Sequence, residues 1–228
     1  MKERFSKGEK FSDNESAALM RGILQGVNYI HERSIVHRDL KPQNILVMDS
    51  NDLSTIKLID FGLGNQNVKA MRHHDLYCGT ATFMAPEVAM HQTYSKNVDI
   101  WAIGIIMHMA LTGGKHPIAD ENDDYTSFME KLRNLKKCEP TQKFSDIALN
   151  LFHRLSAVHP QYRYAAKDAL MHPWITRRRY TDIPLSFLDK VSNLEYERKL
   201  NNKVMLMQFL ALVQTQKSSV NIFETKQF

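Results

Sequence analysis

The sequence predicts a mainly α-helical fold with a few short β segments around a polar loop. The strongest patterns are two long stretches of helical character, at 13–31 and 99–111. The β-type runs are much shorter, so they predict small hairpins and no large sheet. With 228 residues, 43% of them hydrophobic, the chain is long enough for one large domain or a domain with a tail.

The first long helix is predicted over 13–31. Ser12 and Glu15 have the spacing of a capping box, in which each side chain bonds to the other residue's backbone N–H. Apolar residues then recur at helical spacing: Leu19, Ile23, Val27 and Ile30.

Short β segments are predicted next, at 35–36, 45–47 and 55–59, with a turn at Asn51-Asp52 between the last two. They flank a polar loop that contains several charged residues. Residues 62–86 lack clean periodicity, so they are interpreted as a long ordered loop, and loops of that length usually have a function.

Helices dominate the rest of the chain. The stretch 99–111 is almost wholly apolar, which predicts a buried central helix, and Gly113-Gly114 would end it. Further helices are predicted at 125–135, 146–157 and 165–171, and a tail follows Trp174. The acidic run 120–124 is expected to favour the N-terminus of the next helix, with attraction of basic substrates as the alternative.

Charge and composition narrow the function classes. The net charge of +5 is spread along the chain, and the only tight basic run is Arg177–Arg179, which does not favour a nucleic-acid partner. The two cysteines give no disulfide framework. Residues 2–10 are charged rather than signal-like, and the apolar stretch 204–213 is too short to span a bilayer. We therefore expect a soluble cytoplasmic protein with no membrane partner.

The chemistry is concentrated in two motifs, Ile-Val-His-Arg-Asp-Leu-Lys-Pro-Gln-Asn at 35–44 and Lys-Leu-Ile-Asp-Phe-Gly at 57–62. Asp39 can accept a hydrogen bond from a substrate hydroxyl, and Lys41 can place a positive charge on a phosphoryl group. Asn44 and Asp60 supply the oxygen ligands that Mg²⁺ prefers. The set predicts phosphoryl transfer.

These motifs resemble those of the eukaryotic protein kinases, which use His-Arg-Asp, then Asn, then Asp-Phe-Gly. The resemblance implies ATP and Mg²⁺ as cofactors and a protein substrate. It implies Asp39 and Lys41 as catalytic residues, with Lys41 also contacting the nucleotide, and Asn44 and Asp60 as metal ligands. His37, Arg38, Phe61 and Gly62 complete the same motifs.

The resemblance extends over roughly residues 1–176. The segment 78–87 ends in Ala-Pro-Glu, Asp99 opens the family's central helix, and His-Pro-Trp at 172–174 matches its last helix. It implies that Asp99 holds backbone donors of the catalytic loop and that Glu87 pairs with Arg163. It also implies a structural role for Thr80, so Thr82 is the better candidate for phosphorylation, with Arg38 as the residue that would receive the phosphate.

Lys41 and the Gly79-Thr80 pair resemble the serine/threonine kinases rather than the tyrosine kinases. The strand and metal loop at 54–63 are most similar to the calcium/calmodulin-dependent group.

The nucleotide-covering half of a kinase site is not found in the sequence. There is no G-x-G-x-x-G and no strand lysine of the Val-Ala-Ile-Lys kind ahead of His37. We therefore expect a protein-kinase-like C-terminal lobe, a helical bundle with short β hairpins at the catalytic loop, with the N-terminal lobe absent. Two hypotheses remain: part of a serine/threonine kinase, or a non-catalytic kinase-like scaffold or binding module.

The tail at 177–228 contains a predicted basic amphipathic helix around 195–217, with apolar positions at helical spacing and Arg198, Lys199 and Lys203 beside them. It could dock on the chain's own lobe, on a neighbouring subunit or on calmodulin.

Overall fold

A computed structural model describes residues 2–61 and 81–177. They belong almost entirely to the first of the two units into which the chain divides, Met1–Thr176. Gly62, Thr80 and the amphipathic helix expected at 195–217 lie outside the described residues. No helix in the described ranges is long and apolar enough to span a bilayer.

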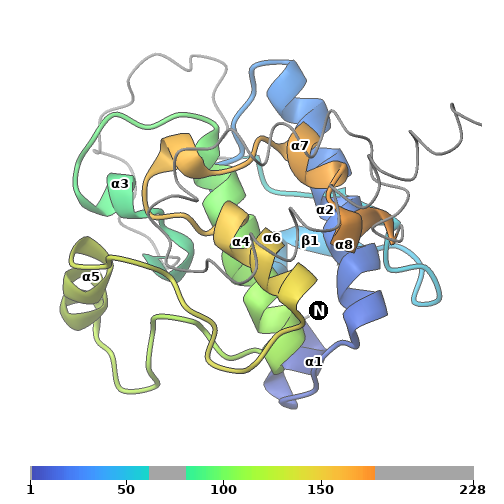
Figure 1. Cartoon of the computed structure of the whole chain (residues 1–228), viewed down its shortest axis with the longest axis horizontal. Coiled ribbons are helices and arrows are strands. Elements are labelled where there is room, and N and C mark those ends of the chain that lie inside the picture. The colour runs from blue at the N-terminus through green and yellow to red at the C-terminus, as the bar shows by residue number, and fades with distance from the viewer. Residues whose placement is uncertain (1, 62–80, 178–228) are drawn as a thin grey trace, which may run out of the picture. The chain divides into compact units, whose positions relative to one another are not determined.

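The described ranges are mainly helical, as the sequence predicts (Figure 1). The α-helices are α1 (Lys2–Ser6), α2 (Asp13–Glu32), α3 (Pro86–Ala89), α4 (Asn97–Thr112), α5 (Tyr125–Arg133), α6 (Asp146–Leu155), α7 (Ala166–Leu170) and α8 (Pro173–Thr176). Short 3₁₀ turns lie at Pro42–Asn44, Ala81–Phe83 and Pro160–Tyr162.

Helix α2 begins with the predicted capping box. The Glu15 backbone N–H donates to Ser12 Oγ, and the Ser12 N–H donates to Glu15 Oε2. An ion pair between Arg4 and Glu15 at 2.9 Å strengthens this start, and hydrogen bonding from Arg4 lowers the pKa of Glu15 to about 2. The indole N–H of Trp174 in α8 donates to Asp13 Oδ1 at 3.0 Å, which ties the last helix to the first turn of α2.

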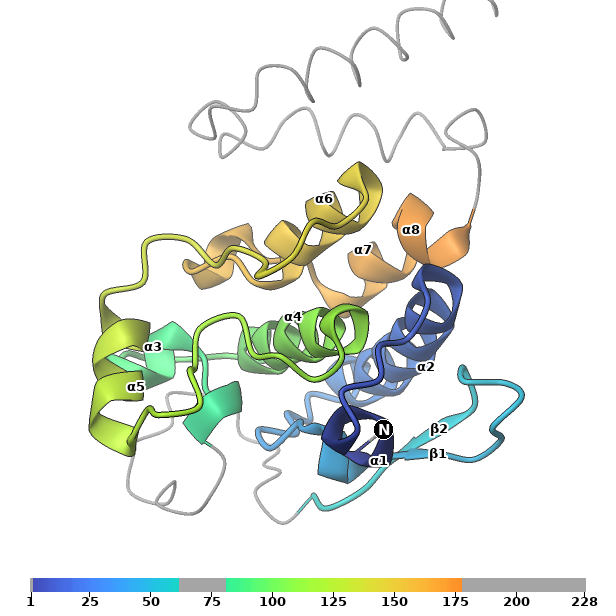
Figure 2. The same ribbon diagram turned by 90° about the horizontal axis from the view of Figure 1, so that it is seen from below.

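Helix α4 is the central helix of the lobe and is buried along nearly all of its length. It packs against α2 and α6, and Figure 2 shows α6, α7 and α8 on one side of it with the hairpin on the other. Gly113 ends α4 with a φ of 72°, a left-handed conformation that favours glycine. A Cβ at this residue would lie 2.4 Å from the carbonyl oxygen of Gly8, so the N-terminal segment packs closely on the end of α4.

A single β-hairpin is present in the described ranges, where the sequence predicted hairpins in the plural. Strands β1 (Ile45–Val47) and β2 (Ile56–Leu58) are antiparallel, with Ile45 opposite Leu58. The run at 35–36 makes an isolated β-bridge at Val36. The Ile35 N–H donates to the Ile30 carbonyl oxygen near the end of α2, and the His37 N–H donates to the Asp99 carboxylate in α4.

The hairpin lies against a glycine notch, Gly22 and Gly26, one helical turn apart on α2. A Cβ on Gly22 would stand 2.3 Å from the carbonyl oxygen of Ser54, and one on Gly26 would stand 3.1 Å from Leu58 Cδ1. A side chain at Gly22 would push the hairpin backbone away from α2, whereas one at Gly26 would require the Leu58 side chain to shift.

The predicted helix boundaries were most accurate for the long helices. Helices α5, α6 and α7 each end before the predicted residue, α8 was expected only through the resemblance at 172–174, and α1 and α3 were not predicted. Short helices carry too few residues to show a period, and α3 and α8 begin with a proline that sequence reasoning more readily assigns to a loop.

Candidate active site

The loop at 35–44, which the resemblance identifies as the catalytic loop, is held in place by Asp99 in the first turn of α4. The Asp99 carboxylate accepts the backbone N–H of His37 at 2.9 Å and that of Arg38 at 2.8 Å, as predicted. It also accepts a hydrogen bond from His31 Nε2 at 2.8 Å. Arg38 has a φ of 69°, a strained conformation that these bonds hold in place.

His37 connects the loop to the strand that leads to Asp60. Its Nε2 donates to the carbonyl oxygen of Ile59 at 3.0 Å, and its Nδ1 accepts from the Asp39 N–H at 3.3 Å. Its ring lies 4.7 Å from that of Phe61, measured between centroids. The two motifs are therefore joined through a buried imidazole.

Three predicted site residues meet around one carboxylate. Asp39 Oδ2 accepts from Lys41 Nζ at 2.6 Å and from Asn44 Nδ2 at 3.0 Å. Asn44 Nδ2 also donates to the Asp39 backbone carbonyl at 2.8 Å. Both amide hydrogens of Asn44 are thus directed at Asp39, and Oδ1 of the amide points the other way. The Asp39 side chain is 14% exposed, so it can be reached from solvent.

Asp60 follows β2 and takes a left-handed conformation with a φ of 63°. Its residue is exposed, and the Ile59 N–H just before it donates to the Asn44 carbonyl oxygen at 3.0 Å. A non-glycine residue in this conformation is uncommon and often marks a functional site.

The side chains of Asn44 and Asp60 suit a magnesium ion that is shared with a nucleotide. Both offer oxygen, and they are joined through the short link between Asn44 and Ile59. No group of three or more His, Cys, Asp or Glu residues that could hold a metal occurs in 2–61 or 81–177. Mg²⁺ commonly uses one or two protein oxygens together with substrate phosphates, so this sparse set fits it.

Glu87 and Arg163 form the buried ion pair that the sequence predicts. Arg163 Nη1 and Nη2 each donate to one Glu87 oxygen at 2.7 Å. The three remaining N–H groups of Arg163 donate to backbone carbonyl oxygens, those of Ala157, Val158 and Asn97. All five guanidinium donors are therefore used, and the pair ties α3 to the segments around α4 and α6.

Arg38 presents the opposite situation. Its Nε and Nη2 are buried and have no hydrogen-bond partner in the described part of the chain. Thr82, the candidate phosphorylation site, is exposed in the 3₁₀ turn Ala81–Phe83, and its carbonyl oxygen bonds to His116.

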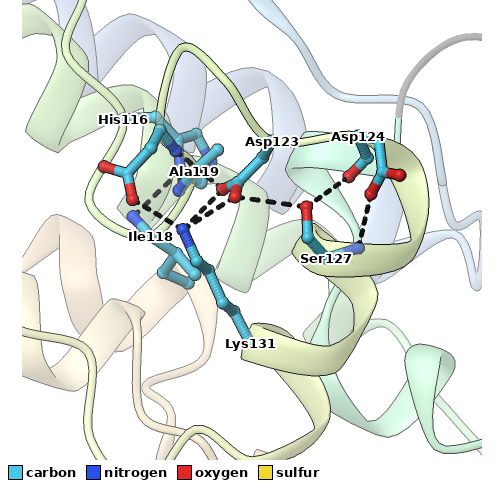
Figure 3. Close-up of polar contacts among 8 residues, drawn as sticks. His116, Ile118, Ala119, Asp123, Asp124, Ser127 and Lys131 are labelled. Carbon is cyan, nitrogen blue, oxygen red and sulfur yellow. Dashed lines mark hydrogen bonds and ion pairs between the residues drawn. The ribbon is translucent and has the colours of Figure 1, made fainter.

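Acidic side chains of the run at 120–124 bond to nearby residues of α5. The Ser127 N–H donates to Asp124 Oδ1 at 2.7 Å, which caps α5. Lys131 forms ion pairs with Asp120 at 2.6 Å and with Asp123 at 2.8 Å, as Figure 3 shows for the labelled Lys131 and Asp123. These bonds lower the pKa of Asp123, first through the backbone N–H of Asp120 and then through Lys131.

Two histidines of this region were missed by sequence reasoning. His31 lies at the end of α2 and bonds to Asp99, and His116 lies in the loop between α4 and α5. Each stands alone in the sequence with no partner nearby, so only the fold reveals what it contacts.

Residues 1–175 match the family model described as the protein kinase domain. The chain belongs to the protein kinase family. The described residues form the helical C-terminal part of such a domain, with the His-Arg-Asp loop, Asp60 and the Glu87–Arg163 pair in one lobe.

The curated relatives are serine/threonine kinases. The chain is 37% identical over 169 residues to human serine/threonine-protein kinase DCLK3, which covers 73% of this chain and 26% of the relative. It is 34% identical over 176 residues to calcium/calmodulin-dependent protein kinase type 1 of Macrobrachium nipponense, covering 76% of this chain and 50% of the relative. Rabbit serine/threonine-protein kinase 17A is 34% identical over 179 residues, with 77% and 44% covered. The chain thus spans half or less of the length of these relatives.

Proposed function

We propose that the chain supplies the catalytic loop and metal ligands of an ATP- and Mg²⁺-dependent kinase that phosphorylates serine or threonine in proteins. The observation that carries this proposal is the cluster around Asp39, in which Lys41 Nζ and Asn44 Nδ2 both donate to Oδ2. Family membership and the serine/threonine kinases among the relatives support the same reaction.

Asp39 would orient the acceptor hydroxyl and take its proton. Because Oδ2 is occupied by Lys41 and Asn44, the carboxylate has a fixed direction, and Oδ1 accepts no bond from any residue in the described ranges. Oδ1 is therefore the atom that would receive the hydroxyl hydrogen bond. This placing of the nucleophile is the main task that phosphoryl transfer leaves to the protein.

Lys41, Asn44 and Asp60 would hold the nucleotide side of the reaction. When bound, ATP provides the phosphoryl group and Mg²⁺ neutralises charge on its phosphates. Asn44 and Asp60 offer oxygen ligands, and Lys41 carries a positive charge 2.6 Å from Asp39, beside the position of the acceptor.

Arg38 would receive the phosphate of a regulatory phosphorylation, with Thr82 as the candidate site. The support is the pair of buried guanidinium nitrogens without a partner in the described ranges. A phosphate oxygen in bonding reach of them would form charge-assisted hydrogen bonds and order the segment that contains it.

The alternative is a non-catalytic scaffold or binding module. It is favoured by one observation: the 228 residues contain no glycine-rich loop and no strand lysine to cover the phosphates. For the segment 195–217, the candidate partners stay the chain's own lobe, a neighbouring subunit and calmodulin. Calmodulin is supported by a calcium/calmodulin-dependent kinase among the relatives. A cytoplasmic location is likewise proposed on sequence grounds alone.

The two functions can be separated by measuring phosphotransfer to a basic Ser/Thr protein substrate in two forms of the protein. We expect the 228-residue chain alone to be inactive, and a fusion of the chain behind the nucleotide-covering lobe of calcium/calmodulin-dependent protein kinase type 1 to be active. In the fusion, Asp39→Ala should lower kcat about 10²–10⁴-fold, and Glu130→Ala, an exposed acidic control on α5, should leave it unchanged. An inactive but folded fusion would support the scaffold, and product that is mainly phosphotyrosine would refute the assignment to serine and threonine.

A further inference from the structure

His116 lies in the loop between α4 and α5, partly buried between two aromatic rings. Its centroid is 6.3 Å from that of Phe83, with the ring planes at 82°, and 5.8 Å from that of Phe128, at 78°. Both are edge-to-face contacts, which favour one orientation of the imidazole. Phe83 belongs to the 3₁₀ turn before α3, and Phe128 belongs to α5. The ring therefore bridges two elements that are 45 residues apart in the chain, from 83 to 128.

Both ring nitrogens of His116 have an assigned task. Nδ1 accepts hydrogen bonds from the backbone N–H of Ile118 at 3.0 Å and of Ala119 at 2.8 Å, so this nitrogen carries no proton (Figure 3). The proton then resides on Nε2, which donates to the carbonyl oxygen of Thr82 at 2.8 Å. Burial lowers the pKa of His116 to about 4, which keeps the ring neutral and the two roles distinct at neutral pH.

The loop behind His116 is held firmly by α5. Asp123 accepts from the backbone N–H of Asp120 at 2.8 Å and from Lys131 Nζ at 2.8 Å, and Asp124 caps the helix. Figure 3 shows this network directly beside the imidazole. The Nδ1 side of His116 is therefore bound to a loop that α5 holds in place. The bond from Nε2 links the Thr82 backbone to the same loop.

The segment that receives this bond is fixed at its other end by the Glu87–Arg163 pair. Between the two anchors lie only residues 83–86, and the 3₁₀ turn that contains Thr82 contacts both α4 and α5. Helix α4 also carries Asp99, which holds the catalytic loop. The backbone at Thr82 is therefore connected, through α4 and Asp99, to the loop that contains Asp39.

We propose that His116 is a positioning residue that fixes the backbone of Thr82 and so shapes the surface offered to the acceptor protein. The effect on the acceptor rests on the proposed kinase function, whereas the effect on Thr82 does not. Among the described residues, His116 bonds to Thr82, Ile118 and Ala119 and packs on Phe83 and Phe128, none of which is proposed to hold the nucleotide. A change at His116 is therefore expected to affect binding of the acceptor protein more than binding of ATP.

Two matched substitutions separate the tasks of the two nitrogens. In His116→Asn the side-chain oxygen stands near the place of Nδ1, so it can accept from Ile118 and Ala119 but cannot reach Thr82. In His116→Gln the amide nitrogen stands near the place of Nε2, so it can donate to Thr82 but offers no acceptor at Nδ1. His159→Asn, a change at an exposed histidine, is the control.

Hydrogen exchange on the 228-residue chain is the test. We expect at least ten-fold faster exchange in peptides spanning 82–90 for His116→Asn, with 116–120 unchanged, and the reverse pattern for His116→Gln. Equal behaviour of the two variants, or faster exchange throughout the chain in both, overturns the proposal.

Kinetics of the active fusion supply the second readout. We expect His116→Asn to raise KM for the acceptor protein at least five-fold while KM for ATP stays within two-fold. We expect His116→Gln to have a KM for the acceptor protein close to that of the unsubstituted fusion. An equal rise in both KM values overturns the role in acceptor binding. An inactive wild-type fusion counts against the proposed function, and the exchange pattern then still decides whether His116 positions Thr82.

Discussion

Two arginines in this lobe, Arg163 and Arg38, differ in how many of their guanidinium donors have hydrogen-bond partners. All five N–H groups of Arg163 donate to protein oxygens, and two of its bonds go to the buried Glu87 carboxylate. Arg38 is held through its backbone by Asp99, yet its Nε and Nη2 are buried with no partner in the described ranges. Buried donors without partners are rare and call for an explanation. Arg163 therefore has all of its donors paired, whereas Arg38 keeps two buried donors that the proposed phosphate would bind.

The strongest test of this contrast is Arg163→Ala. Removal of the guanidinium leaves the Glu87 carboxylate buried without its partner, which should lower the free energy of unfolding by about 3–5 kcal/mol. Urea denaturation followed by circular dichroism measures it, and failure of the variant to fold would agree with a loss at the upper end. Arg21→Ala on α2 is the control and should change the stability by less than about 0.5 kcal/mol. A variant as stable as the parent would show that the pair is not a structural anchor.

Lowering the pH should destabilise the regions that contain buried neutral histidines, and it should not affect the charge of the arginines. Burial lowers the pKa of His108 to about 4 and that of His172 to about 3, both from an ordinary value of 6.5. A depressed histidine pKa means that the unfolded chain binds more protons, so stability is complete above pH 6.5 and falls as the pH drops towards the folded pKa. For each of these histidines, the free energy of unfolding should fall by about 1 kcal/mol between pH 6.5 and 5.5. Below pH 5.5 it should fall by up to about 1.4 kcal/mol for each further pH unit.

Urea unfolding at pH 7.5, 6.5 and 5.5 checks this loss. Stability that is independent of pH over this interval would mean that His108 and His172 are not buried in the neutral form.

The smallest effect is expected for Arg38→Met. The substitution keeps most of the apolar stem and removes donors that have no partner, so the free energy of unfolding should stay the same or rise by up to about 1 kcal/mol. Thermal unfolding of the unphosphorylated chain measures this, with Arg38→Lys as the variant that keeps the charge. A loss of 2 kcal/mol or more would mean that Arg38 is already a structural residue and would remove the contrast with Arg163.

Sequence reasoning predicted the parts of this fold whose information is local. The capping box at Ser12, the apolar helix around Ile103 and its glycine end at Gly113 each depend on neighbouring residues, and each is present. The contacts of Asp99 and of Glu87 with Arg163 were predicted only through the family resemblance, because their partners are 61 to 76 residues away.

What the sequence could not predict depends on distant segments meeting. His116 shows no helical or motif spacing to the Thr82 carbonyl that it bonds, 34 residues away. Likewise, the carboxylates of 120–124 could serve a helix start or a basic substrate, and only the position of Lys131 shows that Asp120 and Asp123 are engaged locally. Of the predicted β segments, those at 45–47 and 55–59 supply the hairpin β1–β2 of the described ranges, and the one at 35–36 makes a bridge at Val36.

The glycine notch on α2 is expected to restrict which substitutions the fold accepts at a site away from the reacting atoms. Asn44 immediately precedes the hairpin and Asp60 follows it, so a displacement of the hairpin from Gly22 is expected to move both proposed metal ligands. A saturation library scored for phosphotransfer in the fusion should therefore reject even alanine at position 22, where a Cβ would lie 2.3 Å from a carbonyl oxygen. Glycine at position 22 is therefore the residue that lets the hairpin backbone approach α2 this closely.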